Sequence, residues 1–183
     1  MEKNFLIAGF GGQGVLLAGE VLANAFMLMD KNVTWYPCYG AEMRGGTVNC
    51  EIVMSDDEVS SVNKAEANFI VVLNQASFDK FENKVKKGGY LIVNTTLAEE
   101  KRNRSDIEYI FAPIAQMAED LGNVKMANML ALGLLSRASK LFSVDILEKA
   151  LDNVLPPHRK NLLPMNKMAM EMGYKYDLLP INC

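Results

Sequence analysis

Gly9-Phe10-Gly11-Gly12-Gln13-Gly14 is the stretch of this sequence that decides its fold. An apolar run, residues 4–8, precedes it, and an apolar run with helical periodicity, residues 15–29, follows it. The order of strand, glycine-rich turn and helix is typical of a phosphate-binding first βα unit. Glycines let the backbone N–H groups approach a ligand, and the helix N-terminus offers further unpaired donors to an anion. The stretch therefore predicts a phosphate site, against the alternative of a tight turn that binds nothing.

Strand-like and helix-like segments alternate along the rest of the chain. We expect strands at residues 4–9, 32–36, 47–55, 68–73, 90–93 and 107–112, and helices at 13–29, 77–85, 114–121, 124–141 and 144–155. This alternation predicts an α/β fold, a Rossmann-like three-layer sandwich whose mostly parallel sheet carries helices on both faces. We expect one domain, residues 1–183, with a C-terminal helical segment, residues 143–172, packed on it.

Proline and glycine mark several of the expected boundaries. Pro37 is expected to end the second strand, and Gly88-Gly89 to end the helix over 77–85. Pro164 interrupts the helical spacing of residues 161–172, whereas Ser143 is expected to cap the helix that follows it. Residues 47–55 alternate apolar and polar, which predicts an antiparallel strand or one near the sheet edge.

The composition excludes several classes of protein. A net charge of -3 gives no basic surface for nucleic acid. No apolar run reaches the roughly 20 residues that a membrane-spanning helix needs, and the N-terminus does not resemble a signal peptide. The three cysteines show neither a disulfide framework nor the four ligands of an iron–sulfur cluster. We therefore predict a cytoplasmic protein that binds no metal and no membrane.

The phosphate ligand predicted here is not NAD. A dinucleotide site places Asp or Glu at the end of the second strand, where it holds the ribose hydroxyls. Residues 34–37 read Thr-Trp-Tyr-Pro, and the nearest acid, Asp30, precedes the strand. A different phosphate-bearing ligand is therefore favoured.

Residues 39–46, Tyr-Gly-Ala-Glu-Met-Arg-Gly-Gly, form a second candidate site. In a parallel α/β sheet, the loops after the first two strands leave from the same edge, so both should line one crevice. Arg44 could then form a bidentate pair with a phosphate or carboxylate, and Gly45-Gly46 would let the backbone approach. The alternative is an exposed arginine in a flexible turn. A single Arg-Gly-Gly in an acidic chain does not indicate RNA binding.

Together these two motifs resemble the gamma subunit of 2-oxoacid:ferredoxin oxidoreductases, and most closely the stand-alone subunit of the 2-oxoglutarate type. The resemblance covers nearly the whole chain. It rests on residues 9–15, on residues 39–50, and on Asn128 with Gly133 in a late helix. The pyruvate type carries a different second loop, which favours 2-oxoglutarate over pyruvate.

The resemblance implies a function. The family oxidatively decarboxylates a 2-oxoacid with coenzyme A, giving acyl-CoA, carbon dioxide and reduced ferredoxin. Thiamine diphosphate and [4Fe-4S] clusters belong to partner subunits, namely alpha, beta and a ferredoxin-like delta. The gamma chain covers the active site and is associated with coenzyme A, and by itself it supplies no catalytic residue. The family's two loops correspond to the candidate cofactor-binding residues Gly11, Gly12, Gln13, Gly14, Tyr39, Glu42, Arg44, Gly45 and Gly46.

Two other functions stay open at this point. The chain could be a self-contained Rossmann-type oxidoreductase that uses a nucleotide, or a purely structural subunit with an empty turn. The glycine-rich turn could also pack on the alpha and beta subunits instead of contacting coenzyme A, and the isolated chain could form a homodimer.

Four further features have a less specific interpretation. Asn128 is either a buried hydrogen-bonding residue or one that faces the crevice. His158 has no partner at catalytic spacing and is expected at the surface. Cys38 could be activated beside the second loop, although an inert half-buried thiol is commoner. The methionines at 165, 168 and 172 are expected to serve the core or a subunit contact.

Overall fold

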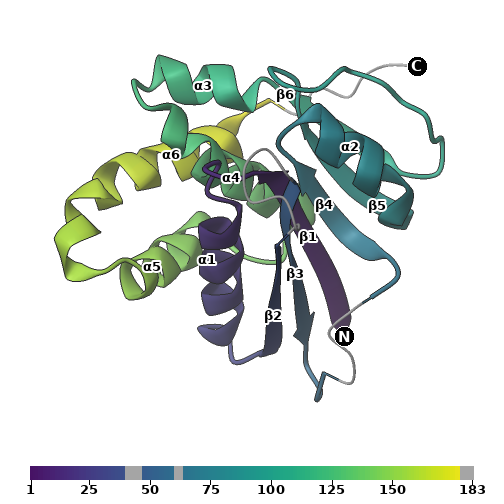
Figure 1. Ribbon diagram of the computed structural model, residues 1–183. Coiled ribbons are helices and arrows are strands. Elements are labelled where there is room, and N and C mark those ends of the chain that lie inside the picture. The colour runs from purple at the N-terminus through teal and green to yellow at the C-terminus, as the bar shows by residue number, and fades with distance from the viewer. Residues whose placement is uncertain (40–46, 60–63, 178–183) are drawn as a thin grey trace.

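A six-stranded sheet forms the centre of the computed structural model, which describes residues 1–39, 47–59 and 64–177 (Figure 1). The strands lie in the order β2-β3-β1-β4-β5-β6. β1, β4, β5 and β6 are parallel neighbours, whereas β3 runs antiparallel to both β1 and β2. The strands are β1 (Glu2–Phe10), β2 (Asn32–Tyr39), β3 (Thr47–Ser55), β4 (Ala67–Val72), β5 (Val85–Asn94) and β6 (Glu108–Ala112).

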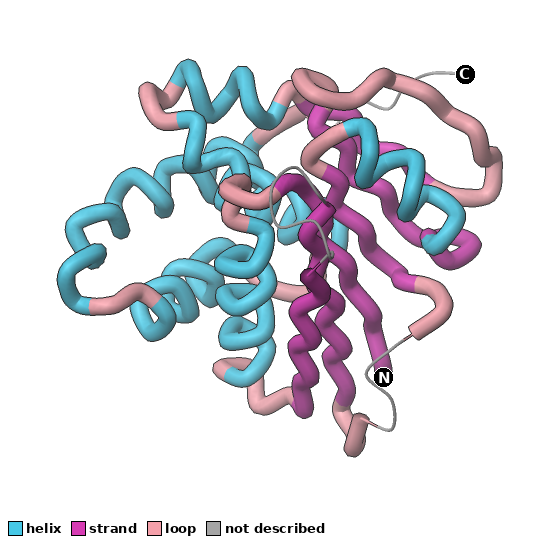
Figure 2. Tube along the Cα trace, viewed as in Figure 1, coloured by secondary structure: helices cyan, strands magenta, loops and turns pink. Residues whose placement is uncertain are grey.

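Helices cover both faces of this sheet, which confirms the three-layer α/β arrangement (Figure 2). The larger core joins one face to α1, α3, α4, α5 and α6, while α2 packs on the other face through Phe78 and Phe81. The helices are α1 (Val15–Met27), α2 (Gln75–Phe81), α3 (Ile114–Asp120), α4 (Ala127–Ser139), α5 (Val144–Val154) and α6 (Leu163–Lys175), with the 3-10 turns η1 (Glu82–Lys84), η2 (Val124–Met126) and η3 (Pro157–Leu162). Among the described residues no helix has the length and apolarity to cross a membrane.

The alternating pattern of residues 47–55 predicts β3 correctly. Cys50, Ile52 and Met54 are buried on the α1 face of the sheet, and the strand is antiparallel, as expected. The prediction that Pro37 ends the second strand is wrong, because β2 continues to Tyr39 and Pro37 pairs with Cys50. β2 lies at the sheet edge, where a residue that cannot donate an N–H is tolerated.

The predicted end of the second helix is also wrong. α2 stops at Phe81 and β5 begins at Val85, so Gly88-Gly89 lies within a strand. Gly88 has a φ of 72°, and the carbonyls of Asn68 and Lys86 leave no room for a Cβ on Gly89. These glycines therefore allow an irregularity within the strand. In sequence, such a pair looks the same as a motif that ends a helix.

The C-terminal helices pack on α1 and α4. α4 and α6 cross at Gly133 and Gly173, where a Cβ on either glycine would meet a backbone carbonyl of the other helix at 2.0–2.1 Å. Pro164 does not interrupt α6 but lies in its first turn. A residue there has no helical partner for its N–H, so proline costs no hydrogen bond. Ser143 caps α5 as predicted, because its side chain accepts a hydrogen bond from Ile146 N at 3.4 Å.

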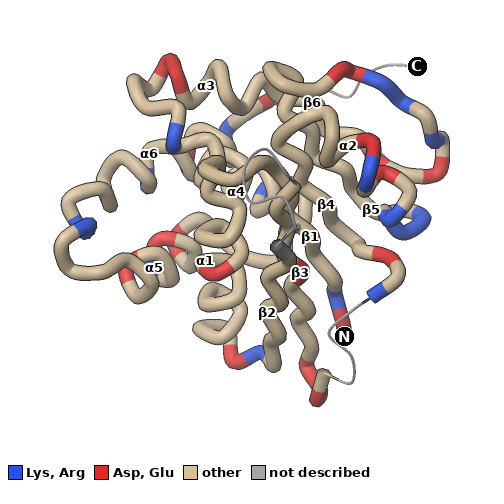
Figure 3. Tube along the Cα trace, in the orientation of Figure 1, with Lys and Arg blue, Asp and Glu red and all other residues tan. Residues whose placement is uncertain are grey.

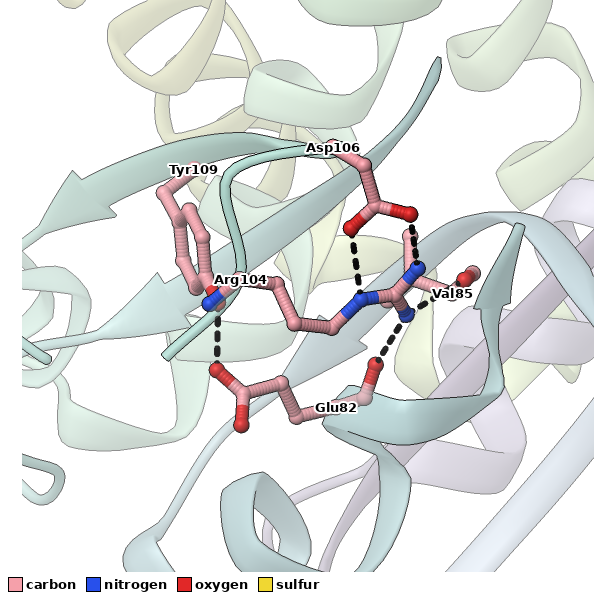
Figure 4. Close-up of polar contacts among 5 residues, drawn as sticks. All are labelled: Glu82, Val85, Arg104, Asp106 and Tyr109. Atoms are coloured by element: carbon pink, nitrogen blue, oxygen red, sulfur yellow. Dashed lines mark hydrogen bonds and ion pairs between the residues drawn. The ribbon is translucent and has the colours of Figure 1, made fainter. Parts of the chain in front are cut away.

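Charged and aromatic side chains hold the amino ends of β5 and β6 together (Figure 4). Arg104 forms a bidentate pair with Asp106 at 2.7 and 2.9 Å, and it also donates to Val85 O at 2.7 Å. Tyr109 donates to the buried carboxylate of Glu82. The segment that connects β5 to β6, residues 95–107, contains no helix. This network attaches the end of that segment to the start of β5.

Candidate functional site

The carboxyl ends of β1 and β2 lie at the same edge of the sheet. Gly9 of β1 and Tyr39 of β2 both pair with Val48, since β3 runs between the two strands. The expectation that the segments after these strands leave from one edge is therefore confirmed for the strand ends. Of the predicted second loop, Glu42, Arg44, Gly45 and Gly46 lie outside the described residues, and Tyr39 is described only by its backbone pairing.

The strand order changes the argument against NAD. β2 runs past Tyr36 to Tyr39, so the lack of an acid directly after Tyr36 no longer carries that argument. In a dinucleotide-binding sheet, the strand with the ribose-binding acid lies directly beside the first strand. Here the neighbour of β1 on that side is the antiparallel β3, whose residue at this edge is Thr47. Thr47 is not an acid, so the argument against NAD now rests on this strand.

The glycine-rich turn leads into an uncapped helix. Gly11 and Gly12 are exposed, and a Cβ on either would meet no atom within 4 Å. Gly12 and Gly14 have φ values of 95° and 72°, which favour glycine. Gly14 is the N-cap of α1, and no side chain among the described residues caps it. The first-turn N–H groups have no partner within the helix, and they follow closely after two exposed glycines.

No charged residue lies between Phe5 and Gly19, so the turn and the first part of α1 are neutral (Figure 3). The first turn of α1 contains no acidic residue that would occupy the positive end of the helix dipole. An anion can therefore approach the helix N-terminus without displacing a carboxylate.

Gln13 turns back into the molecule. Its Oε1 accepts from Phe10 N at 2.6 Å and from Asn74 Nδ2 at 3.2 Å, while its Nε2 donates to Leu73 O at 3.4 Å. A Cβ on Gly9 would lie 2.6 Å from Gln13 Oε1, so Gly9 makes room for this side chain. Gln13 therefore joins the turn after β1 to the segment after β4.

Asn74 and Asn94 extend this contact across the carboxyl edge, and the sequence reasoning missed both. Asn74 caps α2 by accepting from Ser77 N at 2.9 Å. Asn94 donates to Leu73 O at 3.0 Å and accepts from Ala115 N at 3.0 Å, in the first turn of α3. Each asparagine follows a buried apolar strand, and that position at a strand end is the signal that could have identified them.

Asn128 proves to be buried, with 3% of its surface exposed, and it reaches the turn. Its Nδ2 donates to Gly14 O at 3.1 Å, although 114 positions separate the two residues. A Cβ on Gly14 would lie 2.4 Å from that Nδ2. The first of the two interpretations of Asn128 is thus confirmed, and its partner is the predicted site itself.

The remaining candidates, His158 and the cysteines among the described residues, show no sign of catalytic chemistry. His158 is exposed, as predicted. Burial raises the pKa of the half-buried Cys38 thiol, the opposite of the change that activates a nucleophile. Burial also raises the pKa of Cys50 to about 12. In the described part of the chain, no group of three or more His, Cys, Asp or Glu residues could hold a metal ion.

Comparison with known proteins identifies the family of this chain. The model of the pyruvate ferredoxin/flavodoxin oxidoreductase family matches residues 4–176. The chain belongs to this family. It is 33% identical to the 2-oxoglutarate synthase subunit KorC of Methanocaldococcus jannaschii, over 91% of this chain and 92% of that protein. It is 37% identical to the ketoisovalerate oxidoreductase subunit VorA of Methanothermobacter marburgensis, over 73% of this chain and 28% of that protein.

Solved structures share the fold. The keto/oxoacid ferredoxin oxidoreductase gamma subunit from Geobacter sulfurreducens superposes with a TM-score of 0.83 at 28% identity, over 95% of each chain. The 2-oxoglutarate:ferredoxin oxidoreductase from Magnetococcus marinus superposes with a TM-score of 0.84 at 20% identity, over 94% of this chain and 30% of that one. The resemblance drawn from the two motifs is thus confirmed: this chain is a gamma subunit of a 2-oxoacid:ferredoxin oxidoreductase.

Proposed function

We propose that this chain supplies the coenzyme A phosphate-binding crevice of a 2-oxoglutarate:ferredoxin oxidoreductase and covers the active site of its partner subunits. The reaction of the complex would convert 2-oxoglutarate and coenzyme A to an acyl-CoA and carbon dioxide, with ferredoxin as electron acceptor. Thiamine diphosphate and [4Fe-4S] clusters would reside in the alpha, beta and delta chains, and the catalytic groups with them.

The observation that carries this proposal is the uncapped N-terminus of α1 behind two exposed glycines. Coenzyme A bears a pyrophosphate and a 3′-phosphate, and a helix N-terminus is suited to such anions. The absence of a carboxylate from the first turn favours an anionic ligand further. Because Gly11 and Gly12 carry no side chain, the ligand could contact their backbone N–H groups directly.

Two relatives support the choice of ligand and substrate. The Magnetococcus marinus enzyme was solved with 2-oxoglutarate, coenzyme A and succinyl-CoA bound. The KorC subunit from Methanocaldococcus jannaschii is a 2-oxoglutarate synthase subunit that this chain matches over nearly its full length. A subunit named for another 2-oxoacid, the ketoisovalerate relative, matches a smaller share of this chain, 73%.

A matched pair of glycine variants tests the crevice in the reconstituted complex. Gly12 and Gly122 both have positive φ, 95° and 83°, and both have open space where a Cβ would be added. Replacement by Ala should therefore cost each position a similar strain, about 1–2 kcal/mol. Gly12→Ala should raise the apparent KM for coenzyme A several-fold more than the KM for the 2-oxoacid, and Gly122→Ala should change neither. Equal coenzyme dependence in the two variants would contradict the proposal.

Arg44→Ala tests the second wall of the crevice. Losing a charge-assisted phosphate contact costs about 1.5–3 kcal/mol, which corresponds to a rise in the apparent KM for coenzyme A of roughly ten- to a hundredfold. The KM for the 2-oxoacid should stay near its original value. Arg137, an exposed arginine at the far end of α4, provides the control substitution. If Arg44→Ala leaves the coenzyme dependence unchanged, Arg44 is not a phosphate ligand.

A direct titration separates this proposal from a self-contained oxidoreductase. NADH and NADPH fluorescence should be unaffected by the purified chain. Micromolar binding of either nucleotide would count against the role of a subunit that serves another chain's active site.

A further inference from the structure

The turn is held from two sides by neutral amides that bind carbonyl groups. On one side, Gln13 Nε2 donates to Leu73 O at the end of β4. On the other side, Asn128 Nδ2 donates to Gly14 O at 3.1 Å, and the same carbonyl accepts from Ala18 N at 3.0 Å. Neither contact uses the N–H group of Gly11 or Gly12.

Asn128 is itself held in place before it reaches the turn. Its Oδ1 accepts from Met129 N at 2.9 Å, in the first turn of α4. The side chain is 3% exposed, so its amide has little water to bind. With its Oδ1 bound to Met129 N, this buried amide donates from Nδ2 to Gly14 O.

Gly14 is the residue whose conformation sets the direction of the first turn of α1. It is the N-cap, with φ 72° and ψ 23°, a left-handed conformation. Glycine in this region is free to leave it, because no Cβ restricts the backbone. A hydrogen bond to its carbonyl from another helix removes that freedom and fixes the N–H groups that follow.

We propose that Asn128 is a positioning residue for coenzyme A, which holds Gly14 and the N-terminus of α1 in the conformation that receives a phosphate. This inference rests on the proposed function, since it assumes that the turn binds the coenzyme. Asn128 does not touch the ligand. It lowers the entropy that binding would otherwise have to remove from the turn.

Asn166 offers a matched control for a test in the reconstituted complex. It is also buried, with 5% of its surface exposed, and its Nδ2 donates to a backbone carbonyl, Leu162 O, at 2.8 Å. It lies in α6, and its hydrogen-bond partner Leu162 directly precedes that helix. Asn128→Leu and Asn166→Leu each remove one amide-to-carbonyl hydrogen bond at nearly constant volume, and Asn128→Leu also removes the bond from Met129 N. A general loss of stability should affect the KM values of both substrates, whereas a loss of positioning should affect the KM for coenzyme A alone.

Two readouts are compared between these variants. Amide hydrogen exchange of Ala18, whose N–H donates to Gly14 O, should become about five- to tenfold faster in Asn128→Leu and stay unchanged in Asn166→Leu. The apparent KM for coenzyme A should rise roughly three- to tenfold in Asn128→Leu alone, as one lost hydrogen bond predicts. The KM for the 2-oxoacid and kcat at saturating coenzyme A should not change.

Each other result overturns the inference. Unchanged exchange of Ala18 means that Asn128 does not hold the helix end. Faster exchange with an unchanged KM, while Gly12→Ala does raise it, leaves the proposed function standing and removes the role of Asn128. If neither Asn128→Leu nor Gly12→Ala alters coenzyme dependence, the proposed function fails and this inference fails with it.

Discussion

The two ends of the parallel strands are joined by different chemistry. At the carboxyl ends, the neutral amide of Asn74 donates to Gln13, and those of Gln13 and Asn94 both donate to the backbone carbonyl of Leu73. At the amino ends, Arg104 and Asp106 form an ion pair beside Tyr109 and Glu82 (Figure 4). Both devices tie neighbouring strands together, but only the second uses charge.

This difference shows how a binding edge can be stabilised without changing the positive electrostatic potential at the N-terminus of α1. A carboxylate beside the turn would either repel a phosphate or occupy the positive helix N-terminus in its place. Amides satisfy buried backbone groups at little electrostatic cost, and so the helix N-terminus keeps its unpaired donors. The amino ends, where we propose no ligand, can use the stronger charge-assisted contacts.

The largest effect on stability is expected at the amino ends. Arg104→Ala removes the bidentate pair with Asp106 and two hydrogen bonds to the carbonyls of Glu82 and Val85. We expect the free energy of unfolding to fall by about 2–3 kcal/mol, measured by urea unfolding of the full chain. In the complex the KM for coenzyme A should be unchanged. A change in that KM would break the separation of the two edges.

Alkaline pH should weaken the same region. Burial and the adjacent Glu82 carboxylate raise the pKa of Tyr109 from 10.0 to about 12. The folded chain thus favours the protonated phenol, and this stabilisation is complete below pH 10 and lost as the pH rises through 12. The loss should be on the order of 2 kcal/mol.

Tyr109→Phe provides the control for this pH effect. Its unfolding free energy should fall less between pH 10 and 12 than that of the unchanged chain, because Phe has no proton to lose. Parallel pH curves for the two proteins would show that Tyr109 does not carry the effect. The measurement is chemical unfolding at a series of pH values.

The smallest expected difference concerns salt. The Arg104–Asp106 pair is partly exposed, at 21% and 37% of the side chains, so 1 M NaCl should reduce its contribution by less than about 1 kcal/mol. Removal of Asn94, a neutral and fully buried side chain, should cost the same at low and high salt. Unfolding of Arg104→Ala and Asn94→Ala at both salt concentrations makes the comparison, and equal salt dependence would contradict it.

The sequence predicts the first βα unit well because local patterns decide it. The turn at residues 9–14, the alternation in β3 and the cap at Ser143 all depend on neighbours within a few positions. The element ends predicted at Pro37 and at Gly88-Gly89 are wrong, since an edge strand tolerates proline and an irregular strand can contain glycine. Whether such a residue ends an element depends on sheet position, which local sequence does not encode.

The supports of the site were harder to predict than the turn. Asn128 and Gly14 are 114 positions apart, and nothing in a single sequence pairs them. Gln13 was assigned to the ligand because of its motif, yet its amide binds Phe10, Leu73 and Asn74. We propose that Gln13 shapes the turn from within.

The central claim is that the N-terminal turn of α1 receives the phosphates of coenzyme A. Amide hydrogen exchange of the assembled complex, with and without saturating coenzyme A, tests it most directly. We predict protection confined to residues 11–17 and the loop that carries Arg44, with no change at residues 103–109. Unaltered exchange over residues 11–17, together with protection elsewhere in the complex, would contradict the claim.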